Sequence, residues 1–489
     1  MTNPHDTYTS PLAARNASPE MCKIWSPRHK FTTWRKIWLA VAEAQQACGL
    51  DITDEQLDEM RAHLEVTDED MVLAAKYERE LRHDVMAHVH AFGDRCPSAR
   101  GIIHLGCTSQ DVVCNADFVS LSSAFDLINQ KIRRVLISLG GQAMKFITLP
   151  TLGFTHYQPA QPLTVGRRMA QWAYDLRLTS EVGFNIAPRG MHGATGTEAS
   201  FLALFSGDNK ATARFGGEYE KRFRLDIMKD NQPPGHFPGT HSLTGQTYPR
   251  VEDCVSLSEL ATVASVLHKI ATDIRLLSNR KEIDEPFGKS QIGSSAMPYK
   301  RNPMKCERIC GLTRFVMNLV GNAYDTAATQ WLERTLDDSS NRRLSLPEAF
   351  LALDGALDLM HTVADGLIVN EAMVKRNLMA ELPFMATENI MMEAVKMGRD
   401  RQDVHEAIRV HSMAAGQVVK QEGKDNDLLD RLKSEPLLEG IDIDAHLDPM
   451  AYIGRSVEQT ERFIKQVVEP MRSQYGDELE SLGSADRGV

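Results

Sequence analysis

The chain has 489 residues, of which 42% are hydrophobic and 25% charged, a composition that excludes a largely disordered protein. Its 55 Lys and Arg residues against 66 Asp and Glu give a net charge of −11, which argues against general binding to nucleic acid or to anionic membranes. Eight scattered Cys residues without a CxxC pair, together with a polar start of the chain, favour a soluble cytoplasmic protein.

Residues 1–111 carry helical apolar spacing in short stretches, and we expect shorter helices over 31–48, 54–64 and 68–91. The last of these contains the segment RHDVMAHVH, which begins with Arg82, His83 and Asp84. His83 and His88 are five residues apart and would not share a helix face, and no HExxH motif occurs. We therefore expect no metal site in this segment.

The segment HLGCTSQD at residues 104–111 precedes the first of five long segments whose apolar residues repeat at alternating spacings of three and four. This first long segment covers 118–139. Thr108 and Asp111 resemble a capping box in which Asp replaces the usual Glu, so a plain helix N-terminus explains them well. The functional alternative is that Thr108 and Ser109 present hydroxyl and N–H groups to a carboxylate.

The segment GFTHYQPAQP at residues 153–162 is a short polar loop before the second long segment, which covers 162–182. Its prolines end any helix, and its histidine, His156, lies close to Thr155 and Gln158. A lone histidine is more often a structural residue than a catalyst. Its place in a polar loop modestly favours a general acid or base, a role that histidine can fill near neutral pH.

Residues 228–249 are dense in Pro, Gly and Asn and predict an irregular connection. The third long segment follows over 253–281, and as a helix it would be ~43 Å long. Several of its apolar residues lie off the main seam, as they do in the first segment. Because a helix that is apolar on more than one face is buried on more than one side, we favour an oligomer core built from these segments.

The segment GSSAMPYKRNP at residues 293–303 separates the third long segment from the fourth, which covers 309–323. Its two prolines and two serines forbid a helix, and it offers Lys300, Arg301, two hydroxyls and backbone N–H groups. Asn302 and Pro303 fit the N-cap and first position of the fourth helix, a place that suits an anion. A plain connection would explain this cap but not so long a polar loop, so a functional loop is slightly favoured.

The segment RTLDDSSNRR at residues 334–343 precedes the fifth long segment, which covers 349–367. Arg forks onto phosphate oxygens, so this segment could clamp a phosphate through Arg334, Arg342 and Arg343 with Ser339 and Ser340. A solvated charged loop, helped by Asp337 and Asp338, explains the same residues equally well. The residues themselves leave both interpretations open.

Further helices are expected over 388–397, 402–421 and 457–471. No segment alternates like a buried strand, so we expect a mainly α fold. The predicted organisation is an N-terminal helical domain over 1–111, a central bundle of long helices over 112–367 and a C-terminal helical domain over 368–489. A P-loop, a dinucleotide-binding GxGxxG after a strand and a GxSxG elbow are all missing from the sequence.

GSSAMPYKRNP resembles the signature loop of the fumarase/aspartase superfamily of lyases, and GFTHYQPAQP and GCTSQD resemble its two other conserved regions. The three motifs occur in the family's order between long helices and span most of the chain. Within the superfamily, the resemblance is strongest to the animal-like enzymes that act on a succinylated purine nucleotide. It rests on SPLAARNASPEM, RHDVMAHVH, GIIHLG, RTLDDSSNRR, ELPFMATENI and VVKQEG.

The resemblance implies a fumarase/aspartase-like protomer of three nearly all-helical domains, and a homotetramer around a bundle of about twenty helices. It implies active sites assembled from segments of three subunits, and β-elimination of fumarate from adenylosuccinate to give AMP. The same site would act on the succinylated carboxamide ribotide of purine synthesis, with neither a metal nor an organic cofactor. The alternatives are an argininosuccinate-type lyase, and a non-enzymatic structural protein, against which the intact serines, His156 and Lys300 argue.

The resemblance also assigns roles to residues. Ser294 would be the base and His156 the acid. Lys300 and the loop amides would stabilise the serine anion and the doubly charged carboxylate of the transition state, and Glu307 would orient a catalytic residue. The remaining substrate-binding positions are Arg15, Asn16, Arg82, His83, Asp84, Thr108, Ser109, Gln246, Ser295, Asn302, Arg308, Arg334, Ser339 and Arg343. Of these, Arg15, Arg334, Ser339 and Arg343 would hold the phosphate, with His83 and Gln246 nearby. Asn16 stands where the animal enzymes usually have an aromatic residue, so a stacking contact is not expected there.

Overall fold

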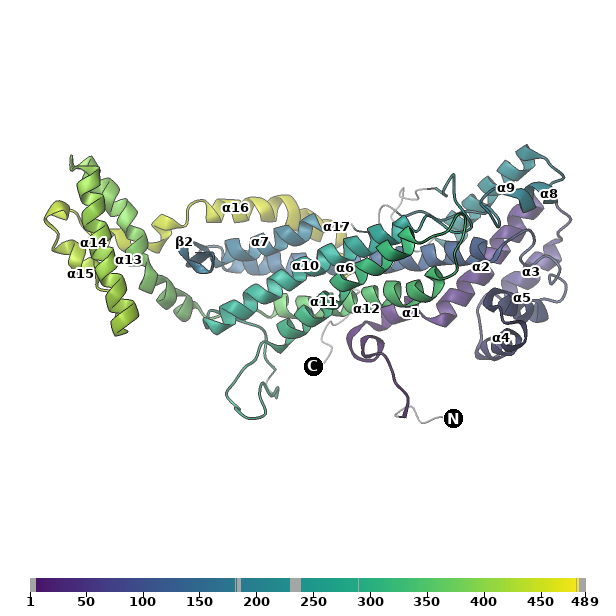
Figure 1. Cartoon of the computed structure of the whole chain (residues 1–489), viewed down its shortest axis with the longest axis horizontal. Helices are drawn as coiled ribbons and strands as arrows, with labels where there is room; N and C mark the ends of the chain where they lie inside the picture. The colour runs from purple at the N-terminus through teal and green to yellow at the C-terminus, as the bar shows by residue number, and fades with distance from the viewer. Residues whose placement is uncertain are drawn as a thin grey trace. The chain divides into compact units, whose positions relative to one another are not determined.

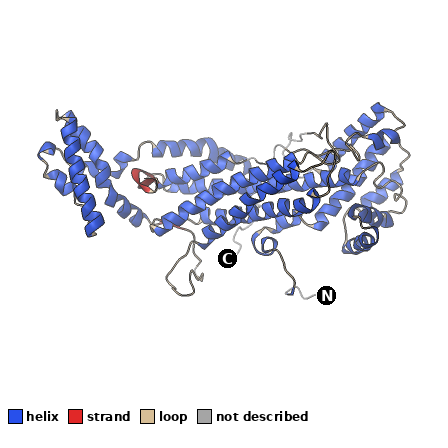
Figure 2. Cartoon of the chain, in the orientation of Figure 1, coloured by secondary structure: helices blue, strands red, loops and turns tan. Residues whose placement is uncertain are grey.

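A computed structural model describes residues 6–180, 182, 186–228, 239–288, 290–480 and 482. Most of these residues are helical, which confirms the predicted mainly α fold (Figures 1 and 2). The predicted irregular connection over 228–249 lies in part outside the described residues. Its described part after residue 238 contains bends and turns up to Pro249.

The N-terminal helices are short, as expected. They are α1 (Pro19–Ile24), α2 (Pro27–Ala47), α3 (Asp54–Ala62), α4 (Asp68–Leu81) and α5 (Asp84–Arg95). The prediction of one helix over 68–91 is wrong, because Arg82 takes a left-handed φ of 55° and ends α4. The chain then restarts at His83, whose ring caps α5.

A capping box opens α4. The Thr67 hydroxyl accepts from the Asp70 N–H, and the Asp70 carboxylate accepts from the Thr67 N–H at 2.9 Å. The same buried carboxylate pairs with Arg35 at 3.1 Å and with Arg95 at 2.7 Å. Asp70 therefore joins α4 to α2 and α5 while it caps its own helix.

The five predicted long segments each contain a long stretch of helix, although the second, 162–182, is helical only over residues 165–178. They form α6 (Ser109–Lys145), α7 (Val165–Leu178), α10 (Val251–Asn279), α11 (Met304–Ala328) and α12 (Asp338–Asp365). Seam residues such as Ile128, Leu267 and Met360 are fully buried. The seams pack helix on helix, as in the T-shaped contact of the Phe125 and Phe350 rings, whose centroids are 4.8 Å apart.

Buried charge also fixes the long helices. Lys131 of α6 pairs with two carboxylates of α12, Asp354 at 2.5 Å and Asp358 at 2.9 Å. Asp354 accepts in addition from the Ser18 N–H and hydroxyl, at 2.6 and 3.0 Å. Because Ser18 is the N-cap of α1, this cluster ties the start of the chain to the long helices.

Two small antiparallel sheets were not predicted. β1 (Pro150–Thr155) and β2 (Gln158–Thr164) form a hairpin, and β3 (Ile283–Asp284) pairs with β4 (Ile368–Val369). The hairpin contains Pro150, Pro159 and Pro162, and because proline is rare inside strands, the sequence carried no strand signal there. A bulge between Thr151 and Gly153 accommodates the irregularity.

The remaining helices are mostly short. They are α8 (Ala199–Leu204), α9 (Asn209–Arg222), α13 (Glu371–Lys396), α14 (Arg401–Glu422), α15 (Leu428–Lys433), α16 (Ser456–Phe463) and α17 (Glu469–Glu480). Three five-residue π-helical turns, η2 (Leu12–Asn16), η3 (Phe223–Ile227) and η7 (Ile464–Val468), accompany them, with 3₁₀ turns η4 (Pro436–Leu438), η5 (Asp444–Leu447) and η6 (Pro449–Tyr452). The predicted helix over 388–397 is too short, because α13 continues through Pro383.

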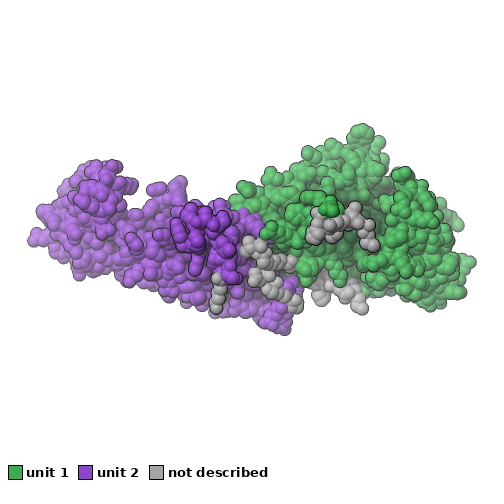
Figure 3. Space-filling model, turned by 90° about the horizontal axis from the view of Figure 1, so that it is seen from below, with its two compact units in different colours: residues 1–132, 179–268, 310–358 green, residues 133–178, 269–309, 359–489 purple. Residues whose placement is uncertain are grey.

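Two compact units divide the chain (Figure 3). Unit 1 comprises residues 1–132, 179–268 and 310–358, and unit 2 comprises 133–178, 269–309 and 359–489. The long helices α6, α10, α11 and α12 each contribute to both units. The division into domains 1–111, 112–367 and 368–489 follows chain order and stays a prediction.

One helix in the described part of the chain, α10, is long and apolar enough to cross a bilayer by length and composition alone. Half of its apolar window is buried inside the protein. A core helix of a helical bundle meets the same criterion, because it is apolar on several faces. α10 is such a helix, since its seam residues Leu260, Val263 and Ile274 are fully buried.

Candidate active site

Unit 1 contains a polar cavity of about 840 Å³ at which three helices begin. Residues in the first turns of α5, α6 and α12 line it, among them Asp84, Ser109 and Ser339. Backbone N–H groups at a helix N-terminus are unpaired and carry partial positive charge, so three of them favour an anion. The sequence-predicted residues that line this cavity are Arg82, His83, Asp84, Thr108, Ser109, Gln246, Arg334, Ser339 and Arg343.

His83 links two of these helix starts. Its Nδ1 accepts from the Met86 N–H at 3.3 Å, and its Nε2 lies 3.4 Å from the Ser109 hydroxyl. A neutral ring that accepts at Nδ1 carries its proton on Nε2, so it donates toward Ser109. The imidazole is therefore held in one tautomer at the start of α5, beside the start of α6.

Asp111 anchors the start of α6. One of its carboxylate oxygens accepts from the Thr108 N–H at 2.8 Å, as the capping interpretation predicted. The other accepts from the N–H groups of His192 and Gly193, both at 3.0 Å, and pairs with the buried Arg189. Both oxygens of the Asp111 carboxylate therefore have partners within the protein. Thr108 and Ser109, next to this anchor, line the cavity.

The segment 334–343 is not a solvated loop. Asp338 is buried at the first position of α12 and accepts from Arg334 and Arg250, each at 2.7 Å. Arg342 is buried too and pairs with Asp253 at 2.6 Å, so its guanidinium stabilises the wall. Burial alone would lower the pKa of Arg342, but the combined attraction of Asp253, Tyr248 and Asp117 raises it above its ordinary value.

Arg343 is an exposed cation of this cavity. Its side chain is 61% exposed, and it pairs with Asp84 at 2.9 Å. An exposed pair of this kind is weak and exchangeable, so Arg343 can turn to an incoming anion at little cost. Gln246 also lines the cavity, and its side-chain amide donates to the Ala194 carbonyl at 3.0 Å.

Sequence reasoning missed Lys30, which also lines this cavity. Its ammonium lies 5.4 Å from the Phe31 ring centroid and 5.0 Å from that of Trp34. Burial lowers its pKa, and the attraction of Asp117 only partly opposes this effect. The spacing of apolar residues in α2 indicates which face of the helix is buried. It does not indicate which polar residue of α2 lines a cavity formed by residues about 50 positions later in the chain.

Arg15 and Asn16 do not line the cavity of their own chain. Asn16 closes the turn η2 by donating to the Pro11 carbonyl at 2.7 Å. Its backbone packs against Gly355 of α12, where a side chain would collide with the Asn16 carbonyl. Gly355 lies roughly 18 Å further along α12 than Arg343, at 1.5 Å per residue. One chain therefore does not bring these two predicted residues to the others.

The signature-like loop belongs to unit 2 and is largely exposed. The Ser294 hydroxyl accepts from the Met297 N–H at 3.2 Å, and the Lys300 N–H donates to the Met297 carbonyl at 2.9 Å. Gly293 has no room for a side chain, which would strike the Lys300 carbonyl. The loop thus folds back on itself, with Ser295 and Lys300 exposed.

The predicted Asn302 cap of the fourth helix is wrong. The Asn302 amide donates instead to the Gly293 carbonyl at 2.8 Å and closes the loop. The carboxylate of Glu285 caps α11 in its place, because it accepts from the N–H groups of Lys305 and Cys306 at 3.0 and 2.9 Å. A cap that comes from 20 or more residues away leaves no local sequence signal.

Two predicted residues lie on the first turns of α11. Glu307 is 52% exposed and approaches Arg275 of α10 at 4.0 Å. Arg308 is its partly buried neighbour. Both belong to unit 2, together with the loop that precedes them.

His156 stands at the tip of the hairpin in unit 2. His156 and Tyr157 form a two-residue turn between the paired residues Thr155 and Gln158, and both have positive φ, 53° and 57°. Two consecutive left-handed residues define the turn type that matches the twist of a hairpin. The turn displays the imidazole to solvent, without a hydrogen-bond partner among the described residues.

The predicted residues thus form two sets. The set in unit 1 surrounds an anion-favouring cavity, apart from Arg15 and Asn16, and the set in unit 2 comprises His156, the loop with Ser294, Glu307 and Arg308. Among the described residues, no group of three or more His, Cys, Asp or Glu is arranged to hold a metal ion.

Comparison with known families and relatives gives a consistent result. A family described as "Lyase" matches residues 13–189 and 243–318, and one described as "Adenylosuccinate lyase C-terminus" matches 383–463. The chain is 46% identical to adenylosuccinate lyase of Schizosaccharomyces pombe and 45% identical to that of Saccharomyces cerevisiae, each over 98% of this chain and 99% of the relative. It is 42% identical to adenylosuccinate lyase of Schistosoma mansoni over 96% of this chain and 97% of the relative.

Solved structures show the same fold at lower identity. A 3-carboxy-cis,cis-muconate lactonizing enzyme from Pseudomonas putida matches with a TM-score of 0.79 and 23% identity, over 95% of this chain and 100% of that chain. A fumarate lyase from Mesorhizobium sp. BNC1 matches with a TM-score of 0.77 and 20% identity, over 94% and 100%. At this identity the structures establish the fold alone.

Proposed function

The chain belongs to the adenylosuccinate lyase family of the fumarase/aspartase superfamily, and we propose that it releases fumarate from adenylosuccinate by β-elimination, leaving AMP. It is a carbon–nitrogen lyase. We extend the proposal to the succinylated aminoimidazole carboxamide ribotide of purine synthesis. The same succinyl group would leave from a nitrogen of that nucleotide through the same chemistry.

The observation that carries this proposal is the meeting of three helix N-termini at the unit 1 cavity. A nucleotide phosphate is a dianion near neutral pH, and the starts of α5, α6 and α12 favour such a charge. Arg343 and Arg334 would supply charge-assisted bonds to its oxygens, and Ser339 a hydroxyl donor. The cavity volume of about 840 Å³ is ample for a nucleotide.

The chemistry needs a base, an acid and a stabiliser of negative charge. We assign the base to Ser294, which would take a proton from the carbon beside a succinyl carboxylate. The electron pair left on carbon forms the double bond of fumarate as the carbon–nitrogen bond breaks. His156 would give a proton to the leaving nitrogen.

A serine hydroxyl is a weak base unless its anion is stabilised. The Met297 N–H already donates to the Ser294 oxygen at 3.2 Å, which supports this assignment. Lys300 would add a positive charge and would also hold the carboxylate that becomes doubly charged in the transition state. Thr108, Ser109, Ser295 and Asn302 would bind the succinyl carboxylates, and Glu307 and Arg308 would orient the loop.

We propose that the active enzyme is a homotetramer whose sites are shared between subunits. Large apolar side chains remain exposed on the long helices, among them Leu276, Phe315, Tyr324 and Leu344. Such surfaces are typical of subunit interfaces. Sharing would also give a role to Arg15 and Asn16, which lie away from the cavity of their own chain and would serve that of a neighbour. We further propose a cytoplasmic location, and action without a metal or an organic cofactor.

Fumarate release tests the proposed reaction. The purified protein is incubated separately with adenylosuccinate and with argininosuccinate, and fumarate is followed by its absorbance. We expect release from adenylosuccinate and its loss in the Ser294→Ala variant, with an unchanged circular dichroism spectrum. Release from argininosuccinate alone would show a different leaving group, and release from neither would indicate a non-enzymatic derivative.

A further inference from the structure

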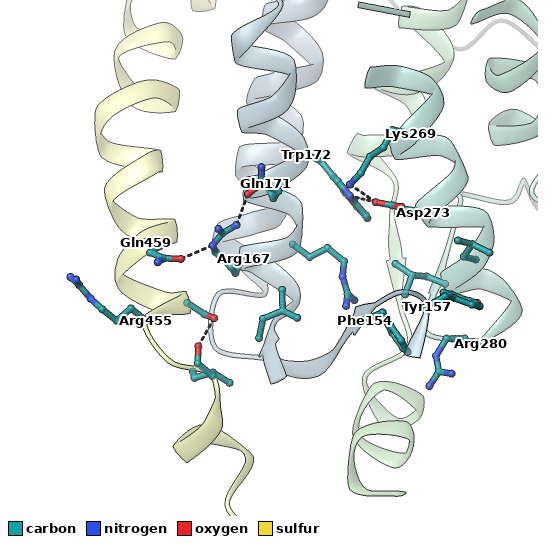
Figure 4. A pocket seen from close by; sticks show the side chains of 16 residues that line it. Phe154, Tyr157, Arg167, Gln171, Trp172, Lys269, Asp273, Arg280, Arg455 and Gln459 are labelled. Atoms are coloured by element: carbon teal, nitrogen blue, oxygen red, sulfur yellow. Dashed lines mark hydrogen bonds and ion pairs between the residues drawn. The ribbon is translucent and has the colours of Figure 1, made fainter. Parts of the chain in front are cut away.

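Unit 2 holds a second cavity, of about 680 Å³, that the proposed reaction does not use. It lies between the β1–β2 hairpin, α7, the C-terminal part of α10 and the start of α16 (Figure 4). Five of its 16 lining residues are cationic, namely Arg167, Arg168, Lys269, Arg280 and Arg455. Asp273 is the one carboxylate among the lining residues.

Asp273 is already neutralised. It accepts from Lys269 at 2.6 Å and from the Trp172 indole N–H at 2.7 Å, as Figure 4 shows. Arg280 is likewise paired, with Glu282 outside the cavity at 3.0 Å. These pairs account for two of the five cations and leave three arginines in the wall.

None of these three arginines has a carboxylate partner among the described residues. Arg167 is held between two neutral amides, Gln459 at 2.8 Å and Gln171 at 3.1 Å (Figure 4). Arg168 donates to the Leu152 carbonyl at 2.6 Å, and burial lowers its pKa against the attraction of more distant carboxylates. The third arginine, Arg455, is exposed.

Neutral partners orient a guanidinium without cancelling its charge. Because Arg168 is partly buried and Arg167 is fixed by two amides, their charges are held in place before any ligand arrives. Oriented guanidinium groups bind phosphate and carboxylate oxygens with two parallel hydrogen bonds. The volume is within the range of small-molecule sites.

We propose that this cavity is a second anion-binding site, separate from the substrate site, for a small molecule with two or more phosphate or carboxylate groups. Arg167, Arg168 and Arg455 are its charge-bearing residues. A second groove continues from it along α7 and α16, shares Arg167 and Gln459 with it, and adds Arg462. The site therefore has room for a ligand whose charged groups are spread along the wall.

Titration calorimetry on the full-length protein tests the site, with tripolyphosphate and citrate as separate probes in 0.1 M salt. We expect at least one probe to bind, and the preferred probe identifies the phosphate or carboxylate class. Binding should weaken about tenfold or more in an Arg167→Gln/Arg455→Gln variant. It should persist in Arg343→Gln, which alters only the cavity of unit 1.

The control is Arg472→Gln, which removes one positive charge, as Arg455→Gln does, at an exposed residue of α17 outside the cavity. If the double variant is unstable, Arg455→Gln alone replaces it, because that side chain is exposed. The proposal is overturned if neither probe binds, if binding is lost in Arg343→Gln and kept in the double variant, or if Arg472→Gln weakens it equally. None of these outcomes affects the fumarate-release test, so a failure of this proposal is distinguishable from a failure of the proposed reaction.

Discussion

His156 occupies a left-handed backbone position, so a substitution that tests its role must remove the imidazole without disturbing the turn. Asn tolerates positive φ better than most residues, which makes His156→Asn the conservative change. We expect kcat for adenylosuccinate to fall about 10²- to 10⁴-fold, because a general acid is lost. Steady-state kinetics measures the fall, and an unchanged Tm shows that the hairpin is intact. A kcat near that of the wild type would remove His156 from the mechanism.

Arg343 is expected to act on binding rather than on chemistry. Its exposed pair with Asp84 contributes little to folding, so Arg343→Gln should leave the Tm unchanged. We expect KM to rise about 10- to 100-fold with kcat altered only slightly, because a contact to a remote phosphate is lost. The matched control is Arg79→Gln, an exposed arginine of α4 that does not line the cavity. An equal effect of both changes would point to general charge rather than a phosphate contact.

Residues in a local motif could be selected from the sequence, and residues placed by tertiary contacts could not. Ser294, His156 and Arg343 stand in segments whose composition is unusual between helices, and their roles in the reaction stay predictions. Lys30 and Glu285 act on parts of the chain that are distant in sequence, and neither has an unusual neighbourhood. The charge of Asp338 also favoured a solvated loop over 334–343. In the structure Asp338 is buried and pairs with two arginines.

At the scale of elements, the cap of α4 gives a prediction for pH. Burial alone would raise the pKa of Asp70, but the Thr67 N–H and the guanidinium groups of Arg95 and Arg35 lower it to about 2. A lowered carboxyl pKa stabilises the fold above the unfolded value near 4, and this stabilisation is lost as the pH falls toward 2. We expect Asp70→Asn to cost roughly 2 kcal/mol at neutral pH.

Thermal unfolding between pH 7 and pH 3 measures this effect. The Tm difference between the wild type and Asp70→Asn should be largest at neutral pH and should shrink below pH 4. Asp68→Asn is the matched control, because Asp68 is an exposed acidic residue in the same first turn. A Tm difference that does not change with pH would contradict the role of ionised Asp70.

The long helices could be predicted because a seam of buried residues repeats over many turns. Their ends could not, because apolar spacing does not mark where a helix begins: the predicted segments 118–139 and 349–367 start 9 and 11 residues after α6 and α12 do. The hairpin could not be predicted, because three prolines interrupt the alternation of apolar and polar residues that marks a strand in a sequence. Likewise, the end of α4 depends on Arg82 in a conformation that glycine usually adopts, so the sequence carried no stop signal.

For the whole molecule, shared sites make a prediction about mixtures of two impaired subunits. Ser294→Ala and Arg343→Gln alter different units of the chain. If each site takes these two residues from different subunits, co-expression of both variants should restore up to about a quarter of the sites. Activity at low substrate concentration measures the restoration, with each variant alone as the control. Sites built within single subunits would show no restoration.

The division into two units also constrains how the protein can be made. The chain passes between the units five times, and unit 1 lacks its last segment until residue 358 has been synthesised. At ribosomal rates, roughly 10 to 45 s separate the emergence of its first segment from that of its last. During this interval the apolar faces of α2 and α6 have no complete core to join. Nascent chains of this protein should therefore depend on chaperones that shield such surfaces until translation is nearly finished.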